Sequence, residues 1–95
     1  MVFYLNNIDS ENDCLKVENW LFDRSRTRKG YALLTLINID ISLFFKLLHE
    51  KDWNDINAFK IEFDDNTSHI IKFTRLECVS IEDSNSNTIN LILFI

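Results

Sequence analysis

The apolar residues between positions 30 and 53 change from strand spacing to helix spacing, and this change constrains the fold most strongly. Residues 31–39 are apolar at almost every position, which predicts a central strand covered on both faces. The apolar residues that follow recur at helical intervals, and either Asp40 or Ser42 can cap the helix by accepting a hydrogen bond from a backbone N–H. We therefore expect a helix over about residues 41–53, packed on the sheet that contains the central strand.

Alternating apolar and polar residues predict two shorter strands ahead of this segment. The first covers residues 2–5, and the second begins at Cys14. The alternation changes phase near Glu18–Asn19, where Trp20 and Phe22 become the apolar positions. We interpret this change as a β-bulge, because one extra residue moves all later side chains to the opposite face.

Residues 59–95 continue the alternation and predict an antiparallel meander. Asp64–Asp65 fall in its first turn, since Asp and Asn tolerate left-handed conformations and bond their own backbone. Residues 69–82 are too many for one flat strand, and a polar break at Thr74–Arg75 divides them. The last strand, 89–95, is apolar on both faces, so we expect it to be paired inside the sheet or against another subunit.

Length and composition limit the chain to one small domain. Its 95 residues are 46% apolar and include eight phenylalanines, which suits one modest core rather than two. The chain has one glycine and no proline, so its turns must use Asn, Asp and Ser. We predict a single domain, residues 1–95, of the α+β (mainly β) class. It would have a twisted antiparallel sheet, with partial closure into a barrel as an alternative, and one helix packed on it.

The order of these elements resembles that of the tube proteins of type VI secretion systems and phage tails. The segments that carry the resemblance are 39–42 (IDIS), which opens the helix, and 88–91 (TINL), in the last strand. The resemblance implies two sheets that close a barrel, one helix in the second half of the chain and a final strand. It also implies a structural subunit that assembles with copies of itself.

The sequence lacks the common patterns of catalytic and metal-binding residues. His49, His69, Cys14 and Cys78 are far apart, whereas zinc ligands typically occur in closely spaced pairs. There is no glycine-rich phosphate loop and no nucleophile motif. We therefore predict a protein that is not an enzyme and that binds no metal and no cofactor.

The sequence also lacks the patterns of export and membrane insertion. Its first residues contain too many acidic and too few apolar side chains for a signal peptide. No apolar run reaches membrane-spanning length. We expect a cytoplasmic protein with reduced cysteines and no membrane association.

Basic residues are unevenly distributed in a chain whose formal net charge is −5. Arg24, Arg26, Arg28 and Lys29 fall at the expected tip of a hairpin, where the three arginines would share one face of an extended ribbon. No aromatic residue interrupts the run, which makes nucleic acid the least favoured partner. The first interpretation is a solvated hairpin tip, and the second is a contact with an acidic protein patch, including that of another copy of the chain.

Acidic residues cluster at or near the turns of the predicted meander. Such a cluster attracts a basic protein surface and accelerates association; its alternative role is solubility. The candidate partner-binding residues are Glu62, Asp64, Asp65, Glu77, Glu82, Asp83, Arg24, Arg26 and Arg28.

Two classes of function follow from these patterns. The first is a non-enzymatic inhibitor, an immunity-type or phage-encoded anti-defence protein, which captures a basic partner surface with its acidic turns. The alternative is a self-assembling structural subunit of a tube-like assembly, in which the arginine run meets the acidic turns of a neighbour. The expected partner is therefore another protein, either foreign or a second copy of the chain.

Overall fold

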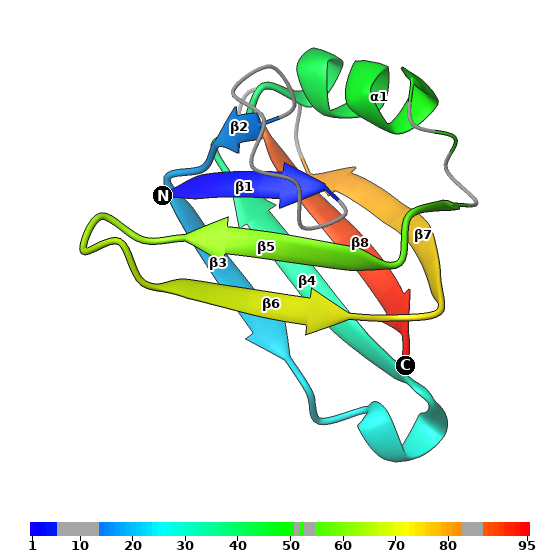
Figure 1. The fold of residues 1–95 in the computed structure, drawn as a ribbon. Coiled ribbons are helices and arrows are strands. Elements are labelled where there is room, and N and C mark those ends of the chain that lie inside the picture. The colour runs from blue at the N-terminus through cyan, green and yellow to red at the C-terminus, as the bar shows by residue number, and fades with distance from the viewer. Residues whose placement is uncertain (6–13, 51, 53–54, 83–86) are drawn as a thin grey trace.

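The chain folds into two four-stranded antiparallel sheets and one α-helix (Figure 1). The computed structural model describes residues 1–5, 14–50, 52, 55–82 and 87–95, with the backbone alone for 78–82. In the first sheet the strand order is β2 (Cys14–Lys16), β1 (Val2–Leu5), β5 (Ala58–Glu62), β6 (Ser68–Lys72). In the second sheet it is β3 (Asn19–Asp23), β4 (Tyr31–Ile37), β8 (Thr88–Phe94), β7 (Arg75–Glu82).

The broad α+β, mainly β class is confirmed, whereas the prediction of one sheet is wrong. The chain divides its strands between two sheets, and these sheets do not close into a barrel. The meander predicted for residues 59–95 is divided in the same way, since β5 and β6 belong to the first sheet and β7 and β8 to the second. The polar break at Thr74–Arg75 does separate two strands, as predicted.

Helix α1 (Ile41–Glu50) lies across one end of the two sheets, at the top of Figure 1. Of the two predicted capping residues, Asp40 is the one that caps it, because its Oδ1 accepts a hydrogen bond from the backbone N–H of Leu43 at 3.0 Å. The buried face of the helix consists of Phe44, Leu47 and Leu48. The predicted helix extended to residue 53, but positions 51, 53 and 54 lie outside the described residues.

The change of phase near Glu18 marks a change of sheet, not the predicted bulge. The backbone N–H of Val17 donates to the carbonyl of Met1, next to the first sheet, at 3.1 Å. The N–H of the next residue, Glu18, donates to the carbonyl of Ile37 in the second sheet, also at 3.1 Å. Because the two sheets bury opposite sides of the chain, the apolar positions shift by one residue at the crossing.

Strand β4 is central in its sheet, as predicted, but it is not covered on both faces. It pairs with β3 on one side and β8 on the other. Ala32, Leu34 and Leu36 are fully buried, whereas the alternate residues from Tyr31 to Ile37 remain partly exposed. Asn38 then adopts a left-handed conformation, with φ of 56°. This conformation reverses the alternation and turns Ile39 into the core.

The final strand is paired inside the sheet, as its sequence predicts. β8 lies between β4 and β7 and pairs antiparallel with both. Its inward residues, Ile89, Leu91 and Leu93, are fully buried. The pairing with β7 contains a register shift between Cys78 and Ser80.

Buried side chains from both sheets and the helix form one hydrophobic cluster. Phe3 of β1 lies near its middle, with ring centroids 6.3 Å from Phe44 of the helix and 4.7 Å from Phe59 of β5. The ring of Phe59 is in turn 4.7 Å from that of Phe73. Tilted pairs at these separations add about 0.5–1.5 kcal/mol each beyond the burial of their area.

Replacing Asp40 with Ala should destabilise the protein by about 1 kcal/mol, because the N–H of Leu43 loses its acceptor at the helix start. Urea unfolding followed by circular dichroism measures the change. The matched control is Ser42→Ala, which removes an exposed side chain that makes no capping bond in the described structure. Equal stability of the two variants would contradict the role assigned to Asp40.

Candidate functional site

Charged side chains gather in two separate regions of the molecule. The first, which we call the basic end, contains six of the ten lysines and arginines, namely Arg24, Arg26, Arg28, Lys29, Lys72 and Arg75. All six are exposed, and two acidic residues, Asp23 and Glu77, accompany them. Eight further acids and three further bases have described side chains, and these belong to the remainder of the molecule.

The β3–β4 hairpin supplies four of the cations. Its tip is a short 3-10 helix, η2 (Thr27–Lys29), and not the extended ribbon that the arginine spacing predicted. The extended backbone that would place the three arginines on one face is therefore absent at residues 27–29. Gly30 ends the turn with φ of 91°, a conformation that other residues adopt only with strain. At the start of the hairpin, the hydroxyl and the backbone N–H of Ser25 hold the pKa of Asp23 below its ordinary value.

The turn between β6 and β7 brings the other two cations, Lys72 and Arg75, to the same end. The backbone N–H of Thr74, in this turn, donates to the carbonyl of Phe94 at 2.6 Å. The next residue along the last strand, Ile95, donates its N–H to the carbonyl of Gly30 in the hairpin at 3.0 Å. The end of β8 therefore joins two turns that are more than forty positions apart in the sequence.

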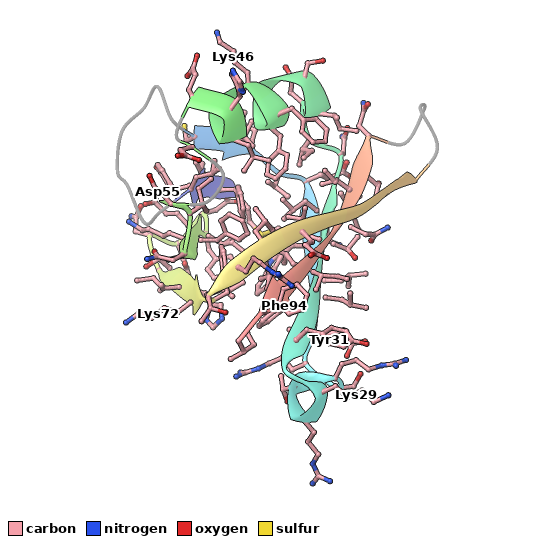
Figure 2. All side chains as sticks on the ribbon, turned by 90° about the vertical axis from the view of Figure 1, so that its right-hand side faces the viewer. Lys29, Tyr31, Lys46, Asp55, Lys72 and Phe94 are labelled. Atoms are coloured by element: carbon pink, nitrogen blue, oxygen red, sulfur yellow. The ribbon has the colours of Figure 1, made fainter. Side chains whose placement is uncertain are left out.

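Aromatic rings lie among these cations. The guanidinium of Arg75 is 4.3 Å from the ring centre of Phe94, and that of Arg24 is 5.7 Å from the ring centre of Phe22. Tyr31 packs against Phe94, with ring centroids 6.4 Å apart. Figure 2 shows Tyr31 and Phe94 close together above Lys29, at the end of the molecule opposite Lys46 of the helix. Sequence reasoning missed Phe94 because β-pairing brings it to Arg75, and it overlooked Phe22, which lies two positions before Arg24.

The second charged region, which we call the acidic corner, consists of Glu18, Glu62, Asp64 and Asp65. Glu18 and Asp64 line one open hollow of about 430 Å³, together with Met1, Lys16 and Asn38. The amino group of Met1 lies 3.6 Å from Oδ1 of Asp64, and the amide of Asn38 donates to Oε2 of Glu18 at 2.7 Å. The carboxylate of Glu62 is 3.8 Å from the ammonium of Lys60.

Asp65 organises the turn that presents this corner. Its Oδ1 accepts hydrogen bonds from the hydroxyl and from the backbone N–H of Thr67. These bonds favour the ionised form and hold the pKa of Asp65 below its ordinary value. Asn66 completes the turn in a left-handed conformation, with φ of 68°, which matches the turn that its sequence predicts.

The structure brings only some of the predicted acidic residues together. Glu62, Asp64 and Asp65 share the β5–β6 turn of the first sheet. Glu77 lies on β7 of the second sheet, with its carboxylate 3.4 Å from the guanidinium of Arg75. Glu82 is the last residue of β7, of which only the backbone is described, and Asp83 lies outside the described residues. The two turns therefore belong to different sheets and do not form one described patch.

The histidines and Cys14 lie in separate places. His49 and His69 are exposed on the helix and on β6, and Cys14 is partly buried on β2. Over the described ranges, no three His, Cys, Asp or Glu side chains are grouped closely enough to hold a metal ion. Cys14 lines a hollow of about 700 Å³, which lies beside the start of the helix. None of the helices in the described part of the chain is long and apolar enough to cross a membrane.

Comparison of the chain with protein-family models, with curated proteins and with solved structures gives no match. Functional proposals for this protein are therefore argued from its charge distribution, its exposed edges and its hollows.

Replacing Thr67 with Val should raise the pKa of Asp65 towards its ordinary value, because the hydroxyl donor is lost. In the wild type the folded-state pKa lies below the unfolded one, so this carboxylate stabilises the fold above the unfolded pKa. That stabilisation disappears as the pH falls through the folded pKa. The variant should therefore lose less stability than the wild type on acidification.

Titration of the side-chain carboxyl groups by NMR measures the change at Asp65 directly. Asp23 provides the internal control, because its own hydrogen bonds come from Ser25 and should not change. An unchanged titration of Asp65 in the variant would contradict the assignment of its pKa to Thr67.

Proposed function

We propose that this protein is a non-enzymatic inhibitor that captures a basic surface of another protein with its acidic corner. It would act as an immunity-type or phage-encoded anti-defence protein does, by occupying its partner. The observation that carries the proposal is the separation of charge. Among the residues with described side chains, the basic end carries six basic and two acidic residues, whereas the remainder carries eight acidic and three basic ones.

The separation is large compared with the range of electrostatic screening. The molecule measures 34 × 29 × 28 Å, whereas the Debye length is about 8 Å at physiological ionic strength. A partner that approaches the acidic corner therefore encounters its negative charge with little influence from the distant basic end. Such a field increases the rate of encounter with a basic surface.

The hollow at the acidic corner suits a basic side chain. Its two acidic lining residues, Glu18 and Asp64, come from different parts of the chain, and both are exposed. Lys16 and the amino group of Met1 also line the hollow. A lysine or arginine of a partner would therefore replace the amino group beside Asp64 and the amide beside Glu18 with charge-assisted hydrogen bonds of its own. Asp65 supports this geometry by fixing the turn.

The same charge separation favours a second candidate, a self-assembling subunit. The β5–β6 turn and the N-terminus lie at the left of Figure 1, whereas the hairpin and the C-terminus lie at the lower right. A contact between the basic end of one copy and the acidic corner of the next uses two different surfaces. Such a contact is heterologous and continues into a ring or a filament.

The inhibitor is tested with the double variant Glu62→Lys and Asp64→Lys, which reverses two charges of the corner and leaves Asp65 to hold the turn. We expect the variant to lose capture of the partner from the source organism and its opponents. The affinity should fall at least about tenfold, because two attractive charge contacts become repulsive. The control, Glu50→Lys and Asp55→Lys, changes the net charge equally at exposed sites near the helix end. Retained capture by the corner variant, or equal loss in both variants, would contradict the proposal.

Sedimentation velocity over a range of concentrations tests the self-assembling subunit. Assembly should produce large species at low salt that disappear at high salt. The corner variant and an Arg26→Glu, Arg28→Glu variant should each abolish them, and mixing the two variants should restore a limited association. A monomer at all concentrations would exclude this candidate and leave the inhibitor proposal intact.

A further inference from the structure

Strand β6 presents a free edge with defined hydrogen-bonding groups. It ends the strand order of the first sheet and pairs only with β5 among the described strands. At the two ends of this pairing, the N–H of Phe63 donates to Thr67 and the N–H of Phe73 donates to Asn57. Antiparallel pairs alternate between bonded and non-bonded residues. Within β6, the backbone N–H and C=O groups of His69 and Ile71 therefore point towards β5.

The alternate residues of β6 turn their backbone N–H and C=O groups away from β5. They are Ser68, Ile70 and Lys72, and all three are exposed. The side chain of Ile70 is 42% exposed, and few large apolar residues of the described chain are exposed as strongly. A strand edge with an apolar side chain at its centre is a template for the addition of another strand.

A hollow of about 130 Å³ runs along this edge. Strand β6 forms one wall, and the opposite side comes from the second sheet, where the β3–β4 hairpin continues beyond β6 (Figure 1). The apolar lining on that side is Phe22 and Ile95, and the side chain of Ile95 is 56% exposed. The hollow therefore offers unpaired backbone groups on one side and an apolar floor on the other.

The charged residues that line the hollow are basic. Arg24 from the hairpin and Lys72 from β6 both contribute to it, and no acidic residue from the described part of the chain lines it. His69 also lies there, with its ring 5.9 Å from that of Trp20. Both cations belong to the basic end, so the hollow lies in the part of the surface that attracts acidic groups.

We propose that the edge of β6 binds an extended segment of a partner protein, in which apolar and acidic residues alternate, as a fifth strand of the first sheet. The backbone of the segment pairs with Ser68, Ile70 and Lys72. Its apolar side chains face Phe22 and Ile95, and its carboxylates lie near Arg24 and Lys72. This site is separate from the acidic corner and does not depend on the function proposed for it.

A second copy of the chain fits this edge less well than a single segment does. Antiparallel pairing of β6 with itself places a two-fold axis perpendicular to the sheet, so both second sheets lie on the same side. Each β3–β4 hairpin already extends beyond the edge of β6 on that side (Figure 1). The two hairpins would then compete for one space, whereas a lone extended segment lies above the hairpin.

The test uses an acetylated and amidated peptide of about seven residues with alternating Val and Glu, long enough to span β6. Binding is measured by amide chemical shifts and hydrogen exchange of the protein. We expect the shifts to concentrate on β6 and on the hairpin near Phe22. The N–H groups of Ser68, Ile70 and Lys72 should become protected, whereas that of His69, already paired with β5, should change little.

The deciding variant is Ile70→Pro, with Ile70→Ala as its matched control. Proline removes the outward N–H at a position where edge strands tolerate it, because the N–H to β5 is not lost. We expect the proline variant to lose binding by at least tenfold, whereas the alanine variant keeps the donor and loses only apolar contact. If the proline variant is unfolded, a peptide methylated at its edge-facing nitrogens replaces it, and this peptide should not bind.

Charge provides an independent arm of the experiment. A Val and Lys peptide should bind at least about tenfold more weakly than the Val and Glu peptide, and Arg24→Glu with Lys72→Glu should reverse this preference. The acidic-corner variant should bind the Val and Glu peptide as the wild type does. Binding that survives Ile70→Pro, or that ignores peptide charge, overturns the proposal. Self-association of the free protein that Ile70→Pro abolishes also overturns it, because the edge would then hold a second copy.

Discussion

The contact of Phe3 with the rings on either side of it is the interaction on which the remaining structure depends. Phe3 is fully buried and meets both Phe44 of the helix and Phe59 of β5. Phe59 extends the row to Phe73, immediately before the chain leaves the first sheet. The row therefore connects the helix, the middle of the first sheet and the point of crossing. In a close-packed interior the loss of one such ring leaves a cavity that its neighbours fill only in part.

The chain passes directly from the first sheet to the second at two places, between β2 and β3 and between β6 and β7. At each place the change of sheet takes two consecutive residues. Val17 and Glu18 bond to different sheets, and so do Phe73 and Thr74, whose N–H groups donate to Asn57 and to Phe94. A crossing this short leaves no loop to absorb errors of register, so each strand enters its sheet with its apolar face already fixed. The second crossing also places Lys72 and Arg75 beside the hairpin, and thereby creates the basic end from distant parts of the chain.

Features that depend on neighbouring residues could be predicted from the sequence, and features that depend on strand partners could not. The cap at Asp40, the turn at Asp64–Asp65 and the paired last strand follow from local chemistry or from the cost of exposing apolar edges. The sequence does not show to which sheet each strand belongs, because apolar and polar residues alternate in the same way in both sheets. The change of phase at Glu18 contained that information, but a bulge and a crossing produce the same pattern. Likewise, nothing near Arg24 in the sequence indicates that Lys72 lines the same hollow.

The position of β8 between β4 and β7 has a consequence for synthesis in the cell. Residues 31–37 leave the ribosome long before residues 88–94, which cover one edge of β4. During that interval Leu34 and Leu36 can pair with β3 on one side but have no strand on the other. Contacts between such distant segments form slowly, and unpaired edges expose the nascent chain to aggregation. The second sheet is therefore completed only after residues 88–94 have emerged, and until then one edge of β4 lacks its partner strand.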